Sequence, residues 1–128
     1  MATIAVQSGK TVMPVNDYVP IMRTFIAGVS LTTGQLVKID TNGKVIPTAA
    51  TTETPVGIVV GSGGGAGYPV SVVQRGVVDG FDISALAYPV AVYTGGAGGL
   101  LDSAGTIAVG RVVPMSEQGG SKTVEILL

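Results

Sequence analysis

The chain has 128 residues, of which 46% are hydrophobic and only 12% charged, and its formal net charge is −1. This balance is the opposite of that in a disordered chain, and the length suits one ordinary domain whose weakly charged surface we expect partners to cover. Because the sequence holds neither cysteine nor histidine, disulfides, thiolate nucleophiles, imidazole bases and the usual zinc ligands are excluded.

Residues 1–17 differ in kind from the rest, because Gly9, Pro14 and Asn16 interrupt short apolar pieces. The pattern predicts an extended N-terminal arm that becomes ordered when it packs on something else. A first edge strand of the same sheet has equal support from the sequence. As an arm, the segment would contact a partner through its apolar residues, which are Ile4, Val6, Val12, Met13 and Val15.

Residues 18–128 are expected to form a single all-β domain with an antiparallel, barrel-like sheet. Glycine and proline punctuate this region every few residues, and the apolar runs between them are too short for helices. Asn42-Gly43 predicts a tight hairpin, and only Ser84–Ala87 is compatible with a single helical turn. The candidate strands are Tyr18–Ile26, Gly34–Asp40, Lys44–Pro47, Val56–Val60, Tyr68–Arg75, Tyr88–Thr94, Val109–Pro114 and Lys122–Leu128.

A weak internal repeat relates residues 34–73 to residues 87–127, with a displacement of 53 positions. Each copy reads as a strand, a glycine turn and a second strand ending in Val-Gly-X-Val-Val, which begins at Val56 and again at Val109. Two similar β units are the simplest interpretation. Duplication and convergence explain the match equally well, because neighbouring strands of a barrel need similar lengths and inward branched residues.

The glycine-rich stretch 61–67 places Gly61, Gly63 and Ala66 at the spacing of a dinucleotide-binding fingerprint. That fingerprint requires a helix to follow, because the helix N-terminus binds the pyrophosphate. Here Pro69 and alternating valines predict a strand instead, so we expect a hairpin loop and no cofactor. Five glycines within seven residues make the loop unusually flexible. A mobile loop that contacts a neighbour through Gly63, Gly64 and Gly65 is therefore a second candidate for a contact surface.

No other pattern predicts catalysis or metal binding. Asp79 and Asp82 are the one close carboxylate pair, but nearby oxygen donors are few, and Asp82 suits the start of the turn at Ser84. We expect no enzymatic activity, no metal and no cofactor. The seven cationic residues are scattered, so nucleic acid is an unsuitable partner, and neither an export signal nor a membrane span is indicated.

The order of glycine and valine spacings over residues 24–128 resembles that of small decoration proteins of tailed-bacteriophage heads, also called cementing or capsid-stabilising proteins. The resemblance lies in Phe25–Asp40, Asn42–Val45, Val56–Ile58, Pro69–Val72, Gly76–Val78, Val90–Tyr93, Gly99–Leu101 and Val109–Arg111.

What this resemblance implies is a compact β-barrel-like or β-tulip domain, with a jelly roll as a variant. Such a protein is made in the bacterial cytoplasm and sits on the outside of the expanded head in the virion. It forms a homotrimer more often than a dimer, and it bridges adjacent major capsid protein subunits. The alternative from the residues themselves is a non-catalytic β-structured binding module of a fibre, surface layer or glycan-binding protein, although a chain without tryptophan offers few aromatic platforms for sugars.

Overall fold

A computed structural model describes residues 3–15, 18–115 and 118–128, with backbone only for residue 115 and residues 118–121. The described residues form an all-β structure that contains no helix. Its strands are β1 (Thr3–Ile4), β2 (Met13–Pro14), β3 (Ile21–Ile26), β4 (Leu36–Ile39), β5 (Val45–Pro47), β6 (Gly57–Val60), β7 (Pro69–Asp79), β8 (Ala91–Thr94), β9 (Leu101–Asp102), β10 (Ala108–Met115) and β11 (Gln118–Leu127).

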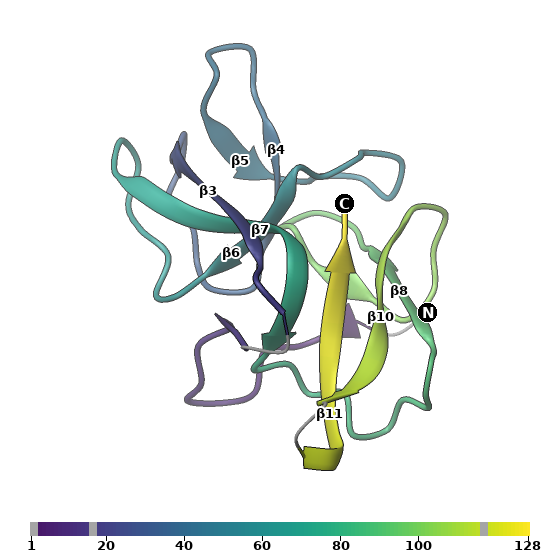
Figure 1. The fold of residues 1–128 in the computed structure, drawn as a ribbon. Coiled ribbons are helices and arrows are strands. Elements are labelled where there is room, and N and C mark those ends of the chain that lie inside the picture. Colours follow the sequence, from purple (N-terminus) through teal and green to yellow (C-terminus); the bar gives the residue numbers. More distant parts are fainter. Residues whose placement is uncertain (1–2, 16–17, 116–117) are drawn as a thin grey trace.

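The strands belong to one antiparallel sheet that curls into a half-barrel (Figure 1). The main path through the sheet runs β1-β9-β8-β10-β11-β7-β6-β4-β5. At its centre lies β7, whose N-terminal half pairs with β3 and β6 and whose C-terminal half pairs with β2 and β11. Because one long strand carries both halves of the sheet, β7 fixes how the two halves sit relative to each other. None of the described segments is a helix of the length and hydropathy needed to cross a lipid bilayer.

Two units with the same strand order build the sheet. In the first unit β4 pairs with β5 and β6, and β6 pairs with β7. In the second unit β8 pairs with β9 and β10, and β10 pairs with β11. The pairing pattern that the internal repeat predicts is therefore present, although the register between the first and third strands differs. Val37 lies opposite Gly57, whereas Gly110 lies opposite Val92.

The glycines of the repeated Val-Gly-X-Val-Val segment occupy equivalent places in the two units. A Cβ on Gly57 would collide with the Val73 backbone of β7, and a Cβ on Gly110 would collide with the backbone of β11 at Glu125 and Ile126. Val73 and Ile126 are themselves 53 positions apart. Each glycine thus permits the next strand to approach closely, which is a recurrent role of glycine inside a strand.

Both faces of β6 are buried, and they belong to two apolar clusters. Ile58 and Val60 lie in the larger cluster, which contains residues of both units, while Val59 lies in a smaller cluster beside β4 and the end of β3. Short branched side chains suit such a core because they pack on a pleated surface with little loss of rotamer freedom. The larger cluster contains Ile4, Val12, Leu36, Ile58, Val60, Val73, Val78, Phe81, Ile83, Val92, Leu101, Val109, Val112, Val124 and Ile126.

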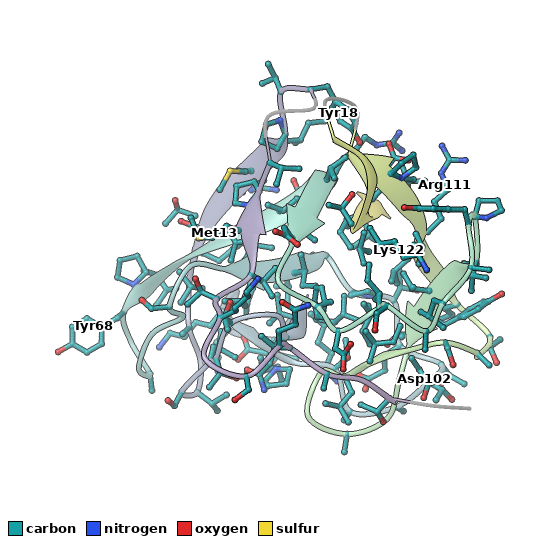
Figure 2. All side chains as sticks on the ribbon, turned by 90° about the horizontal axis from the view of Figure 1, so that it is seen from below. Met13, Tyr18, Tyr68, Asp102, Arg111 and Lys122 are labelled. Carbon is teal, nitrogen blue, oxygen red and sulfur yellow. The ribbon has the colours of Figure 1, made fainter. Side chains whose placement is uncertain are left out.

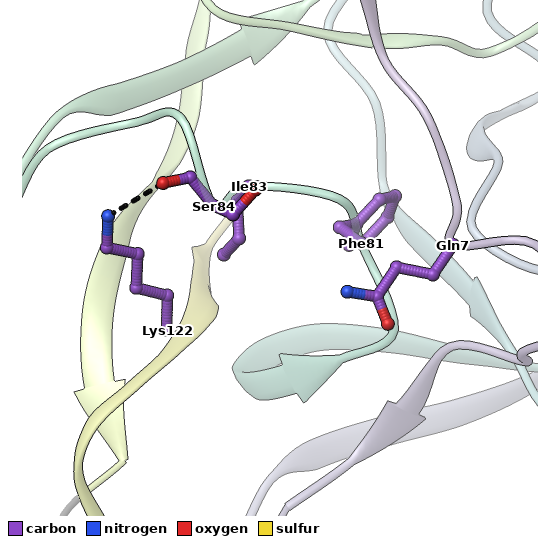
Figure 3. A pocket seen from close by; sticks show the side chains of 5 residues that line it. All are labelled: Gln7, Phe81, Ile83, Ser84 and Lys122. Carbon is purple, nitrogen blue, oxygen red and sulfur yellow. Dashed lines mark hydrogen bonds between the residues drawn. The ribbon is translucent and has the colours of Figure 1, made fainter.

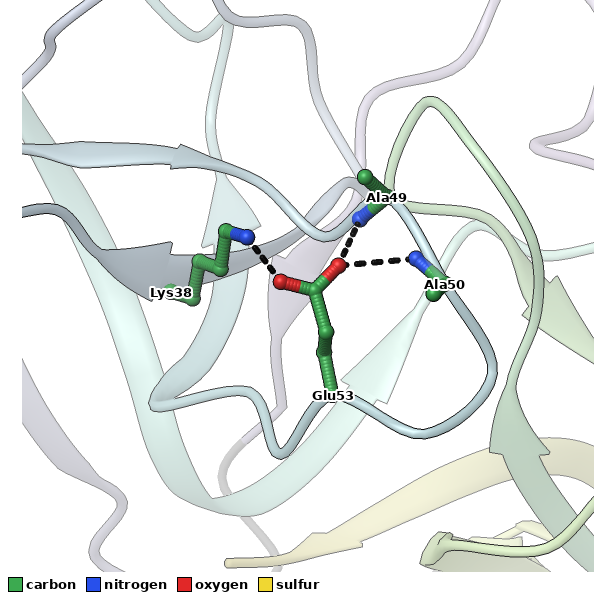
Figure 4. Close-up of polar contacts among 4 residues, drawn as sticks. All are labelled: Lys38, Ala49, Ala50 and Glu53. Carbon is green, nitrogen blue, oxygen red and sulfur yellow. Dashed lines mark hydrogen bonds and ion pairs between the residues drawn. The ribbon is translucent and has the colours of Figure 1, made fainter.

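Polar contacts hold the long connection between β5 and β6. Glu53 accepts hydrogen bonds from the backbone amides of Ala49 at 2.6 Å and Ala50 at 2.8 Å, and its other carboxylate oxygen pairs with Lys38 of β4 (Figure 4). A carboxylate that receives several donors fixes a loop more firmly than a neutral acceptor does. The loop is therefore attached to β4 as well as to the strands it connects.

Three expectations from the sequence need correction. The strand expected to end at Arg75 continues to Asp79, because Gly76 leaves room for Pro20 and does not end the strand. Residues 84–87 form no helical turn but a hydrogen-bonded turn, in which the Leu86 amide donates to the Ile83 carbonyl. The strand expected from Tyr88 begins at Ala91. The hairpin at Gly43 is confirmed, with a φ of 77° and two backbone amides bonded to the Asp40 carboxylate.

Candidate interaction surface

The N-terminal segment is part of the domain and not a free arm. Ile4 and Val12 are 6% and 0% exposed, and both lie in the larger apolar cluster. Val6 packs against the same cluster, and the Val15 amide donates to the Val77 carbonyl at 2.8 Å. The expectation of a partner contact is thereby corrected for Ile4 and Val12, which their own chain covers, and it stays a prediction for Val6, Met13 and Val15. Met13, 49% exposed, is the member of the set that stays open; residues 1–2 and 16–17 lie outside the described part of the chain.

The glycine-rich loop 61–67 is likewise held by its own chain. Gly64 and Leu31 exchange two backbone hydrogen bonds of 2.8 and 3.0 Å, and Gly67 donates to Ala27. Gly63 has a φ of 77°, and the Leu31 backbone lies where a side chain would be, so glycine is required there for both reasons. The loop expected to be mobile is therefore fixed on residues 27–31. Gly63 and Gly64 are partly covered, and Gly65 is exposed.

The largest group of exposed apolar side chains lies on β3 and beside it. Val19 is 88% exposed and Ile21 is 54% exposed, which are high fractions for residues of this kind. We define the apolar strip as the exposed residues of this region, namely Met13, Tyr18, Val19, Ile21, Met22 and Ile26. Figure 2 labels two of them, Met13 and Tyr18, and also shows Tyr68 projecting from the molecule. Exposed apolar side chains that gather on one element of a fold mark a candidate interaction site.

The strand that carries the strip is an edge of the sheet. In the described part of the chain, β3 pairs along its length with β7 alone. The exposure of its residues does not alternate, because five of its six residues are exposed and only Phe25 is partly buried. The guanidinium of Arg23 lies 4.8 Å from the centre of the Phe25 ring and covers it from solvent. β3 therefore offers exposed apolar side chains and an unpaired backbone edge.

A polar contact fixes one end of the strip. The Tyr18 hydroxyl donates to Glu125 of β11 at 2.9 Å, and Glu125 also accepts from Arg111 of β10 at 2.9 Å. Partial burial raises the pKa of Tyr18 above its ordinary value, and the hydrogen bond to the Glu125 carboxylate and its charge raise it further. The segment before β3 is thus tied to the second unit of the sheet.

One pocket of the described chain brings together a hydroxyl and an ammonium group, but their contacts are structural. It holds about 340 Å³ and is lined by Gln7, Phe81, Ile83, Ser84 and Lys122 (Figure 3). The Lys122 ammonium donates to the carbonyls of Ser84 at 3.1 Å and Leu86 at 2.6 Å, so it holds the turn in place. Nothing in the pocket pairs a nucleophile with a base.

The carboxylate pair singled out in the sequence serves local structure. Asp79 accepts from the Gly80 amide at 2.9 Å, and Asp82 accepts from the Ser84 hydroxyl at 3.3 Å. In the part of the chain that the structure describes, no three acidic, histidine or cysteine side chains gather where they could hold a metal ion. The turn role expected for Asp82 fits this contact, although the Asp82 carboxylate meets a hydroxyl and caps no helix.

Sequence analysis missed the apolar strip, although the strand itself was predicted. The segment Val19-Pro-Ile-Met-Arg-Thr-Phe-Ile26 places apolar residues at consecutive positions, a pattern usually read as a strand buried on both faces. Two signals of an edge were present in it. Pro20 cannot donate a hydrogen bond to a neighbouring strand, and Arg23 is a charge in the middle of the run.

No family model, curated protein or solved structure matches this chain.

Proposed function

We propose that this chain is a structural protein that decorates the outside of a tailed-phage head and stabilises the shell by bridging neighbouring major capsid protein subunits. The observation that carries the proposal is the apolar strip, a group of exposed apolar side chains on and beside the edge strand β3. The resemblance in glycine and valine spacing supplies the partner. Attachment is non-covalent, in the virion, and needs neither nucleic acid nor a membrane.

The physics of a shell suits such a protein. Many copies act together on a closed lattice, so each contact needs only modest affinity. Burying one valine-sized side chain contributes about 1.5–3 kcal/mol, and about 1.4 kcal/mol is a factor of ten in affinity. Burial of a few residues of the strip, Val19 and Ile21 above all, therefore contributes to attachment, against which the cost of association is set.

The rigid fold also fits a bridging role. A brace transmits force only when its own parts do not move, and here both the N-terminal segment and the glycine-rich loop are bonded to the sheet. The expectation of an arm that orders on binding is replaced by a preformed surface. Preformed surfaces bind without an ordering cost.

The test uses expanded heads of the phage that encodes the chain, prepared without this protein. Wild-type protein is expected to sediment with the heads and to raise the temperature at which they release DNA. Val19→Asp places a charge on the most exposed residue of the strip and is expected to weaken sedimentation about tenfold or more. Thr52→Asp, at an exposed loop residue away from the strip, is the matched control and should bind as the wild type does.

Two results would contradict the proposal. Heads whose thermal disruption is unchanged by saturating wild-type protein would show that the chain does not stabilise the shell. Equal binding by Val19→Asp and wild type would show that the strip is not the attachment surface. Circular dichroism of each variant shows whether the fold is intact.

A further inference from the structure

The hydrogen-bonding pattern of β7 determines which backbone groups of β3 point away from the sheet. In β6, Ile58 lies opposite Val73 of β7, and Val60 lies opposite Ser71. The backbone amide of Val59, between them, points away from β7 and donates a hydrogen bond to the Gln35 carbonyl. Hydrogen bonding alternates along an antiparallel pair, so Val73 and Ser71 bond to β6, and Val72 and Val70 bond to β3.

The same alternation assigns the groups of β3 itself. Arg23 lies opposite Val72 and Phe25 opposite Val70, so the backbone groups of Arg23 and Phe25 are used in bonds to β7. The N–H and C=O groups of Met22, Thr24 and Ile26 therefore point away from β7. No described backbone group pairs with them. These three alternate residues, whose backbone groups point away from β7, form a template for one more strand.

We propose that a second copy of this chain occupies this edge, with the two β3 strands antiparallel about a two-fold axis that passes through Thr24. In this register Thr24 faces Thr24 of the partner subunit, and each of the three open residues exchanges two hydrogen bonds with its opposite. Met22 lies opposite residue 26 of the other copy, so the exposed apolar side chains of Met22 and Ile26 cover each other.

Charge disfavours one of the neighbouring registers. Arg23 is the one charged residue of β3, and the axis through Thr24 places it opposite Phe25 of the second copy, which a guanidinium can cover as it covers Phe25 within one chain at 4.8 Å. A shift of the axis to residue 23 would place two arginines directly opposite each other, which destabilises a pair of strands. The net charge of −1 leaves little repulsion between two copies.

The contact is limited to the part of β3 that can form a ladder. A bulge interrupts the pairing between Ile21 and Met22, so Val19 and Ile21 lie outside the shared strands. The dimer would therefore carry two copies of the remaining apolar strip on one body. The proposal does not depend on capsid binding, and a two-fold contact stands in place of the trimer that the resemblance implies.

The first experiment exchanges charges on the axis. Thr24 is exposed, so Thr24→Lys and Thr24→Glu leave the core unchanged. Wild-type protein is expected to have twice the 12.8 kDa mass of one chain in light scattering. Each variant alone should fall to the mass of one chain, because like charges then meet on the axis. An equal mixture of the two should recover the doubled mass, because lysine then faces glutamate.

A second experiment uses the absence of cysteine from the chain. Opposite residues of a hydrogen-bonded pair have Cα atoms about 5.5 Å apart, which a disulfide can span. Thr24→Cys is expected to form a covalent dimer on mild oxidation, whereas Thr52→Cys, at an exposed loop position, should stay largely uncrosslinked.

Several results would overturn the proposal. A wild-type mass of one chain at millimolar-range concentrations would show that the edge has no such partner, and a mass of three chains would show a different symmetry. Variants that keep the doubled mass, or a mixture that fails to recover it, would show that Thr24 does not meet its own copy. If dimers form but heads do not bind, the dimer proposal stands and the decoration proposal fails.

Discussion

Gly110 tests whether close strand approach determines this fold. In Gly110→Ala, the new Cβ would collide with the carbonyl oxygen of Glu125 and lie 3.2 Å from the Cα of Ile126. Both obstacles are backbone atoms of β11, which is bonded on its other side to β7, so neither can rotate away.

The expected cost follows from these contacts. Overpacking of this kind costs about 1–3 kcal/mol, and a weakened ladder hydrogen bond adds roughly 0.5–1.5 kcal/mol. Alanine offsets about 0.4–1 kcal/mol by restricting the unfolded chain. The net loss is about 2 kcal/mol, which for a domain of this size lowers the Tm by about 6–10 °C.

The assay is urea unfolding and thermal melting at one fixed protein concentration, because association makes the Tm depend on concentration. Gly96→Ala is the matched control, since a Cβ there has no atom within 4 Å. It should stay within about 0.5 kcal/mol of wild type or gain slightly. Gly57→Ala, the equivalent change in the first unit, should destabilise as Gly110→Ala does. If Gly110→Ala were as stable as Gly96→Ala, the role assigned to the repeated glycine would be refuted.

Three further predictions concern the core, the loop between β5 and β6, and the end of the strip. Leu36 is fully buried, so Leu36→Ala should cost about 2–5 kcal/mol in urea unfolding. Glu53→Ala removes two hydrogen bonds from backbone amides and an ion pair, whereas Lys38→Met removes the ion pair alone. Glu53→Ala should therefore lower the free energy of unfolding by about 1–3 kcal/mol more than Lys38→Met does. The raised pKa of Tyr18 means that the folded state holds this proton more tightly than the unfolded state. Its contribution to stability is complete below about pH 10 and is lost as the pH rises through the raised value. Glu125→Gln should bring that pKa down in an absorbance titration at alkaline pH.

Each of these has a result that would contradict it. A loss below about 1 kcal/mol for Leu36→Ala would mean that the site collapses without a cavity. Equal losses of stability in Glu53→Ala and Lys38→Met would mean that the ion pair alone stabilises the loop. A phenol titration unchanged by Glu125→Gln would show that the carboxylate does not control Tyr18.

The strands around the hairpin at Gly43 and those of the two Val-Gly-X-Val-Val segments were predictable because local signals mark them. Gly43 requires a positive φ, and the Val-Gly-X-Val-Val segments at Val56 and Val109 combine branched residues with a glycine that admits the next strand. The pairing order of the two units also follows from the repeat. These features depend on residues that are close in sequence or repeated at a fixed distance.

What could not be predicted depends on contacts between distant residues. β1 pairs with β9 through Thr3 and Asp102, which lie far apart in the sequence, and each strand has only two residues. Gly76 carries the usual signal of a strand end, yet the strand continues because Pro20 occupies the space beside it.

The candidate surface could not be predicted from the sequence for the same reason. The burial of Ile4 and Val12 and the exposure of β3 depend on which strands lie beside them. Composition indicates that a segment is apolar, but it does not indicate which neighbour covers it. For this reason Ile4 and Val12 were wrongly expected to face a partner, and the strand expected at Tyr18–Ile26 was predicted without its exposure.

The central claim is that the chain acts by attaching its apolar strip to a viral shell and bracing it. Electron microscopy of expanded heads, incubated first without and then with the purified protein, tests this directly. The account predicts extra density at fixed positions on the outer surface, with the strip against the shell, and heads that withstand a higher temperature. Bare heads after incubation at saturating concentration would contradict it.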